Sequence, residues 1–158
     1  MYRWTSSRAG GIAGLLGSLG DAAVHYLCFF VFKTTTTAHY ISALIFPLKQ
    51  VTPLRYACGL LAHFAAGLPI GLFLALLLHY GGLKNAYLKG MGLGSFTWVI
   101  HTAIIPNLIS PRPYVYRTEA EALVDLLAHL VFGLLAAWYL LRTASPVALE
   151  AHPPASAP

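Results

Sequence analysis

Charged residues are scarce in this chain. Only 9% of its 158 residues are Asp, Glu, Lys or Arg, whereas 58% are hydrophobic, and the mean hydropathy is +0.67. Soluble domains carry roughly 25% charged residues, so this composition excludes an ordinary soluble protein. Because the apolar residues gather in four long segments, the sequence predicts a polytopic membrane protein whose length fits one domain.

Cysteine and the sequence motifs of soluble enzymes are also rare or lacking. Cys28 and Cys58 fall in separate apolar segments and match neither a disulfide framework nor a zinc spacing, so we interpret them as small packing residues. No G-x-S-x-G, H-E-x-x-H or Walker sequence is present, which leaves open whether the protein is an enzyme. The net charge of +5 is spread over loops and ends, which fits anchoring at a lipid bilayer and excludes a nucleic-acid-binding surface.

Four apolar segments are each long enough to cross a bilayer, which requires about 20 helical residues. The first follows a basic start, like a secretory signal, but it has the length of a full span and no cleavage site follows it, so we expect a retained helix. The segment Ala38 to Phe46 is too short to cross and predicts an interfacial or re-entrant element. The expected spans are about residues 9–32, 54–79, 86–109 and 118–141.

The sequence therefore predicts an all-α, polytopic membrane four-helix bundle over residues 1–142. Residues 143–158 form an Ala/Ser/Pro-rich tail that we expect to be disordered. The turn after the second span is short, which predicts that the second and third spans are antiparallel neighbours. Thr118 and Glu121 have the spacing of a capping box at the start of the fourth span. Three pairs of glycines have the spacing that lets membrane helices approach closely: Gly10 and Gly14, Gly67 and Gly71, and Gly90 and Gly94.

The orientation in the membrane is not decided by charge. Five Lys and Arg residues fall on each side of the predicted bundle, so the positive-inside rule favours neither orientation. We expect a bacterial cytoplasmic membrane and a cytoplasmic N-terminus, because the first helix often dominates orientation. A homo-oligomer and a subunit of a larger membrane complex both stay open.

One histidine lies in each predicted span: His25, His63, His101 and His129. A rise of about 1.5 Å per residue puts all four roughly 18–24 Å from one face of the bundle. Each shares a helix face with glycine or polar residues, which is the face expected to point inward. Ionisable groups inside membrane spans are costly and usually mark a site.

Three interpretations of this histidine layer remain open. In the first, His25, His63, His101 and His129 hold a transition-metal ion or haem, for instance for electron transfer. In the second, an Asp/His network serves proton- or ion-coupled transport as a relay or channel. In the third, the polar contacts only fix the register of a structural or assembly subunit that has no cofactor. The residues expected to orient the histidines or to relay protons are Asp21, Asp125, Glu121 and Thr97.

Three short stretches carry a resemblance to a known group of proteins. They are the glycine-rich first span that ends in His25-Tyr-Leu-Cys-Phe-Phe, the stretch Ile105-Pro-Asn-Leu-Ile-Ser-Pro, and Leu130-Val-Phe-Gly-Leu-Leu. With these features, residues 10 to 142 resemble small, uncharacterised four-helix membrane proteins of spore-forming Gram-positive bacteria. The resemblance implies the four-span architecture and no particular activity.

Overall fold

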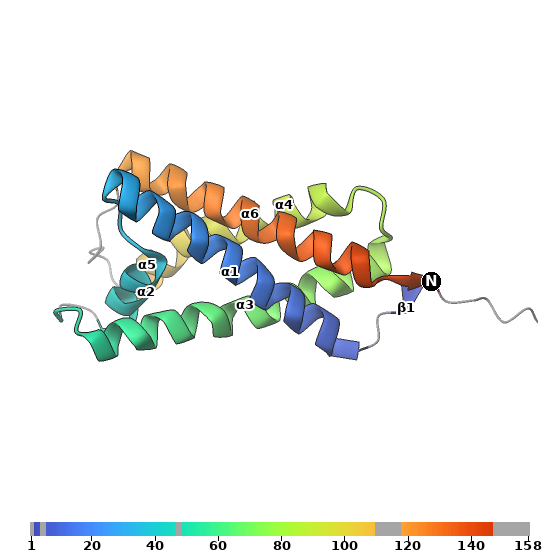
Figure 1. Cartoon of the computed structure of the whole chain (residues 1–158), viewed down its shortest axis with the longest axis horizontal. Coiled ribbons are helices and arrows are strands. Elements are labelled where there is room, and N and C mark those ends of the chain that lie inside the picture. The colour runs from blue at the N-terminus through green and yellow to red at the C-terminus, as the bar shows by residue number, and fades with distance from the viewer. Residues whose placement is uncertain (1, 4–5, 47–48, 110–117, 147–158) are drawn as a thin grey trace, which may run out of the picture.

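The computed structural model describes residues 2–3, 6–46, 49–109 and 118–146, and the fold is helical (Figure 1). The expected disordered tail lies outside the described residues from residue 147 onward, and residues 145 and 146 form a short strand. The long predicted segments begin and end within a few residues of the observed helices. The elements are β1 (Tyr2–Arg3), α1 (Ser6–Phe32), α2 (Thr37–Ile45), α3 (Pro53–Gly81), α4 (Ala86–Val99), the π-helix η1 (Ile100–Ile104), α5 (Ile105–Ile109), α6 (Glu119–Thr143) and β2 (Ser145–Pro146).

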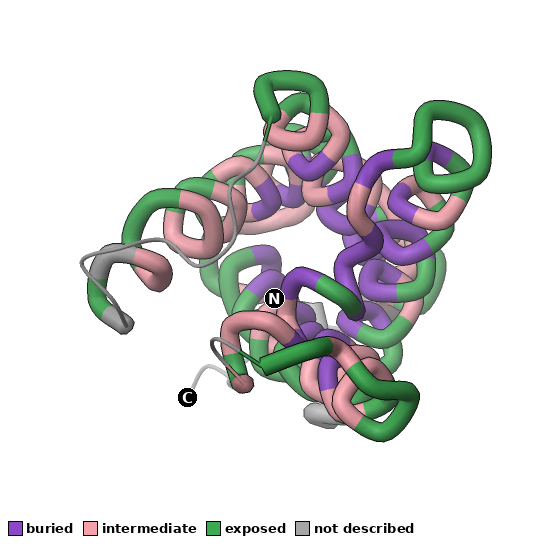
Figure 2. The backbone as a smooth tube through the Cα atoms, turned by 90° about the vertical axis from the view of Figure 1, so that its left-hand side faces the viewer, coloured by how far each residue is buried: buried purple, intermediate pink, exposed green. Residues whose placement is uncertain are grey.

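Three of the helices are long and apolar enough to cross a membrane: Arg8–Phe32 in α1, and the whole of α3 and α6. The fourth predicted span, residues 86–109, is instead divided among α4, η1 and α5. Large apolar side chains cover the outside of the bundle, and Figure 2 shows the buried residues on the inward faces of the helices. Phe30 is 67% exposed and Leu61 is 70% exposed, whereas Asp125 in the interior is 0% exposed.

The helices pack in two pairs that are joined by a central contact. α1 packs against α3, α4 packs against α6, and α1 and α6 run side by side in opposite directions through the middle of the molecule (Figure 1). The short α3–α4 connection predicted close neighbours, but these two helices touch only sparsely. The prediction that these two helices pack against each other was wrong. Close contacts at glycine pair α3 with α1 and α4 with α6, and a cavity lies between α3 and α4.

The glycine pairs lie where two helix backbones meet. A Cβ atom on Gly14 would collide with the carbonyl group of Gly67, and one on Gly71 would collide with the backbone of Gly10 and Gly14. Gly90 meets the Gly133 carbonyl in the same way, so α4 and α6 use a second contact of this kind. The close-packing prediction is therefore confirmed for both helix pairs.

The short segment after α1 enters the bundle. Thr36 caps α2 by accepting a hydrogen bond from the backbone N–H of His39, and the helix ends after one further turn and a half, just before Pro47. Tyr40 and Ser42 of α2 are buried and the helix packs on α3, where Gly59 gives room for the α2 backbone. His39 faces outward and is exposed. The segment is therefore a short helix with one buried face, and the interfacial and re-entrant interpretations both stay predictions.

The π-helix η1 is followed by Pro106, which changes the backbone hydrogen bonding of this turn. The backbone N–H of Ile105 bonds to the carbonyl of Ile100, five residues back, and in this register the next N–H would bond to the carbonyl of His101. Residue 106 is proline and has no N–H, so the His101 carbonyl accepts a hydrogen bond from the Tyr40 hydroxyl at 3.2 Å instead. α2 therefore completes the backbone of the turn that carries His101.

Candidate metal centre

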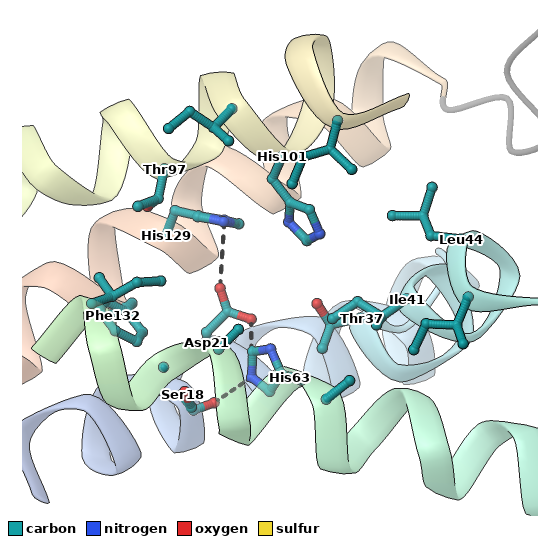
Figure 3. A pocket seen from close by; sticks show the side chains of 17 residues that line it. Ser18, Asp21, Thr37, Ile41, Leu44, His63, Thr97, His101, His129 and Phe132 are labelled. Carbon is teal, nitrogen blue, oxygen red and sulfur yellow. Dashed lines mark hydrogen bonds and ion pairs between the residues drawn. The ribbon is translucent and has the colours of Figure 1, made fainter. Parts of the chain in front are cut away.

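Asp21 of α1 lies at the centre of a buried group of ionisable side chains (Figure 3). Its Oδ2 atom is 3.5 Å from Nδ1 of His129, and its Oδ1 atom is 3.7 Å from Nε2 of His63 and 3.9 Å from Nε2 of His25. Three of the four predicted histidines, from α1, α3 and α6, therefore surround one carboxylate. Each of these rings also has a shorter contact elsewhere, which fixes its direction.

His25 joins the two central helices. Its Nε2 atom lies 3.1 Å from Oδ1 of Asp125 on α6, and both side chains are buried. Because a carboxylate only accepts hydrogen bonds, the ring donates from Nε2, and Nδ1 is left as a buried acceptor with no hydrogen-bond donor among the described residues. This bond links residues that are 100 positions apart in the sequence.

His63 and His129 are each oriented by a backbone carbonyl. Nε2 of His63 donates to the carbonyl of Ser18 at 2.9 Å, and Nδ1 of His129 donates to the carbonyl of Asp125 at 2.8 Å. In a neutral imidazole a bond of this kind uses the one N–H and leaves the other ring nitrogen with its lone pair. Histidines that bind metals commonly have this second contact.

His101, Asp125 and His129 form a group that could hold a metal ion. One donor atom from each of the three lies within 4.8 Å of the others, and the rings of His101 and His129 have centroids 5.7 Å apart. Zn–N bonds of about 2.0–2.1 Å keep two ligands of one ion within about 4.2 Å, so these side chains would close in slightly on binding. His101 is on the π-helix, an element that is frequent at functional sites.

The remaining predicted site residues, Thr97 and Glu121, have other partners. Thr97 lines the cavity beside the histidines, but its hydroxyl donates to the carbonyls of Leu93 and Gly94. Glu121 accepts bonds from Thr35 and completes the predicted capping box with Thr118. It therefore holds the start of α6 to the segment before α2, one helical turn from Asp125.

A cavity of about 560 Å³ adjoins the histidines, between α3 on one side and α4, η1 and α5 on the other. Sequence reasoning did not identify Ser18 and Thr37, whose hydroxyl groups lie at its wall near Asp21 (Figure 3). Ser18 stands one turn before Asp21 on the same helix face, which is a signal that could have indicated it. Thr37 and Tyr40 could not be found in this way, because their positions depend on the entry of α2 into the bundle.

Comparison of the chain with known protein families, with curated proteins and with solved structures finds no match in any of the three. The function of this Asp/His cluster must therefore be argued from its own geometry.

Proposed function

We propose that the protein is an integral membrane protein whose four crossings are α1, α3, α6 and the continuous helical stretch α4–η1–α5. The distribution of polarity supports this proposal, because apolar side chains such as Leu88 and Phe96 of α4 are exposed, while Asp21, His25, His63 and Asp125 are buried. Residues 86–109 are together long enough to cross a bilayer, although α4, η1 and α5 are each short. In this arrangement α2 is a re-entrant helix beside the Asp/His cluster.

We further propose that the cluster binds one transition-metal ion in the membrane interior, through His101, Asp125 and His129. The observation that carries the proposal is the convergence of these three donors within 4.8 Å from two separate elements, η1 and α6. Imidazole and carboxylate together suit zinc and the other divalent first-row metals. Asp21 lies 3.5 Å from Nδ1 of His129, the ring nitrogen that faces away from the ion, and so helps to hold this ring in its orientation.

The charges of the cluster favour a metal ion over haem. Two buried carboxylates, Asp21 and Asp125, balance a divalent cation, and charges inside a membrane are tolerated when they are paired. A haem plane would need apolar space around its axial histidines, but a carboxylate oxygen of Asp125 lies within 4.8 Å of the donor nitrogens of His101 and His129. His25 holds the Asp125 carboxylate in its orientation from the other side.

Metal content of the detergent-purified protein tests this function. The wild-type protein and a His39→Ala control, altered at an exposed histidine outside the cluster, should both hold about one equivalent of metal by inductively coupled plasma mass spectrometry. His101→Ala should hold much less metal, because removing even a residue that only orients a metal ligand typically costs 10–100-fold in affinity. Metal at background in the wild type, from cells supplied with zinc, iron and copper, would refute the proposal, and so would full retention in His101→Ala.

Proton-coupled transport is a second candidate, and the contacts of Asp21 favour it. Successive ionisable groups on α6, α1 and α3 (His129, Asp21 and His63) are separated by 3.5 and 3.7 Å, so they lie next to one another as in the Asp/His chains of membrane proton relays. If the wild-type protein holds no metal, an Asp21→Asn variant in liposomes tests this candidate. Proton flux in the wild type that disappears in the variant would support a relay, and no flux in either would leave a structural role for the cluster.

A further inference from the structure

The cavity between α3 and α4 has one polar end and a long apolar wall. Asp21, Ser18 and Thr37 lie at the polar end with His63 and His129 (Figure 3). Apart from these residues and from Thr97, His101 and Phe132, the lining is aliphatic except for Gly67 and comes from α2, α3, η1 and α5. It includes Ile41, Leu44, Ala62, Ile70, Ile100 and Ile105. Its volume of about 560 Å³ is within the ~300–1,000 Å³ range typical of small-molecule sites.

Three buried polar atoms at this end have hydrogen-bonding capacity that the protein does not use. They are Oγ of Ser18, Oδ1 of Asp21 and Oγ1 of Thr37, and none has a hydrogen-bond partner within the described part of the chain. Their residues are only 0%, 2% and 2% exposed. All three residues line the cavity, and buried polar groups without partners are costly, so this end of the cavity favours a polar ligand group.

The route into the cavity leads towards the outside of the bundle. Ile45 at the end of α2 and Ala66 of α3 line the cavity and are themselves exposed. Because α3 and α4 touch only sparsely, the opening between them faces the same surroundings as the apolar outer surface. In the proposed membrane location, these surroundings are lipid chains.

The charge at the polar end selects the head group. With a divalent ion bound, as proposed above, the two carboxylates Asp21 and Asp125 are neutralised, so an additional anion would leave a net charge in a medium of low dielectric constant. An uncharged head with one hydroxyl group can both donate to Asp21 and accept from Ser18 or Thr37.

We propose that this cavity binds a single-chain lipid with an uncharged hydroxyl head, such as a long-chain alcohol. The head lies against Asp21, Ser18 and Thr37, and the chain follows α2 and the facing sides of α3 and η1. The lipid site deepens the metal-binding function, on which it rests for the neutrality of the polar end. It gives the proposed metal centre a lipid substrate or ligand of defined chemistry.

Photolabelling of the detergent-purified full chain tests the proposal. The probe is hexadecanol with a diazirine near the end of its chain, and labelled peptides are mapped by mass spectrometry. Labelling should be saturable, should fall on α2, α3 and η1, and should be competed by unlabelled hexadecanol. Hexadecanoate, which carries a charge, should compete roughly tenfold more weakly.

Two substitutions on α3 form a matched pair for this experiment. Ala62→Phe places a ring in the cavity and should reduce saturable labelling roughly tenfold. Ala65→Phe adds the same ring on the exposed side of the helix, outside the cavity lining, and should leave labelling unchanged. Thr37→Val removes one hydroxyl without changing the side-chain shape and should weaken labelling roughly fivefold, the loss of about one hydrogen bond.

Metal content is measured on the same samples, so the two proposals fail separately. Metal in the wild type together with equal labelling of the Ala62→Phe and Ala65→Phe variants overturns the lipid site alone. Equal competition by hexadecanoate overturns the uncharged head. Saturable labelling that Ala62→Phe abolishes, in a protein without metal, overturns the metal centre and supports the cavity as the site of the chain.

Discussion

At the scale of single residues, the properties of the cluster depend on which group accepts each histidine proton. Asp125 accepts from His25 and stands beside His129, while the His63 and His129 rings donate to backbone carbonyls. Substituting one member therefore leaves a named buried group without its partner. The loss of such a partner can cost about 3–5 kcal/mol in proteins, whereas polar contacts in a membrane bundle average about 0.6 kcal/mol.

The variants Asp125→Ala and Asp125→Asn show which of these two energies applies to the His25–Asp125 bond. Asn keeps an oxygen that can accept from His25, so its cost should be about 1 kcal/mol. Ala leaves Nε2 of His25 with only the Asp21 carboxylate, 3.9 Å away, and should cost about 3 kcal/mol. The free energy of unfolding in detergent, measured after chelation of metals, gives both values. Glu119→Ala, at an exposed position of the same helix, serves as the control. Equal stability of the two Asp125 variants would contradict the assigned bond.

The sequence predicted the depth of each histidine along its helix, but it could not predict which groups the histidines contact. Counting residues along each helix put His25, His63, His101 and His129 at similar depth, and glycine and polar neighbours indicated the inward faces. The partner of each nitrogen depends on the rotation of each helix to within a few degrees, which side-chain packing decides. Glu121 illustrates the limit, because its spacing from Asp125 suggested a role beside the histidines while its carboxylate faces Thr35 and Thr118.

At the scale of helices, backbone contacts at glycine decide which elements are neighbours. The motif spacing was readable from the sequence, and it identified the close-packing faces of α1, α3 and α4. The sparse contact between α3 and α4 was not predictable, because a short connection only limits how far apart two helix ends are. The π-helix was not predictable for a similar reason. Pro106 indicates an irregular helix, but the Tyr40 hydroxyl that bonds to the His101 carbonyl comes from α2.

Gly14→Ala and Gly11→Ala test the crossing of α1 and α3. A methyl group at position 14 meets the Gly67 carbonyl, whereas one at position 11 meets only a Leu68 methyl at 3.7 Å, an ordinary contact. Gly14→Ala should therefore destabilise the protein by about 2 kcal/mol through overpacking. Gly11→Ala should leave stability unchanged or raise it by up to about 1 kcal/mol, because alanine favours helix. The melting temperatures of the two variants in detergent test this prediction. Similar decreases in both variants would contradict the observed contact between α1 and α3.

At the scale of the whole molecule, the helices form two halves, one before and one after the turn that follows α3. The first contains the α1–α3 contact and α2, the second contains the α4–α6 contact, and the halves meet chiefly along α1 and α6. The all-α, apolar character of the chain was predictable from its composition. The division was not, because it follows from pairwise packing rather than from order in the sequence.

The two halves should assemble when they are expressed as two separate polypeptides. The chain is divided in the turn between Gly82 and Lys84. An affinity tag on the first half should co-purify the second, because no helix is cut and the α1–α6 contact is retained. Asp125→Ala in the second half removes the hydrogen bond across this contact and should reduce the recovered amount. Failure of the unmodified halves to co-purify would show that the connection itself holds them together.

The His25–Asp125 bond also has a consequence for the time course of biosynthesis. A ribosome completes α1 about a hundred residues before it reaches Asp125, so in the proposed membrane location Asp21 and His25 enter the bilayer before their partner exists. An unpaired aspartate at the centre of an inserting helix costs about 2.5–3.5 kcal/mol of insertion free energy. The newly synthesised α1 is therefore held only weakly in the bilayer until α6 has been inserted. Defects in α6 should therefore appear first as loss of α1 from the membrane and degradation of the nascent protein.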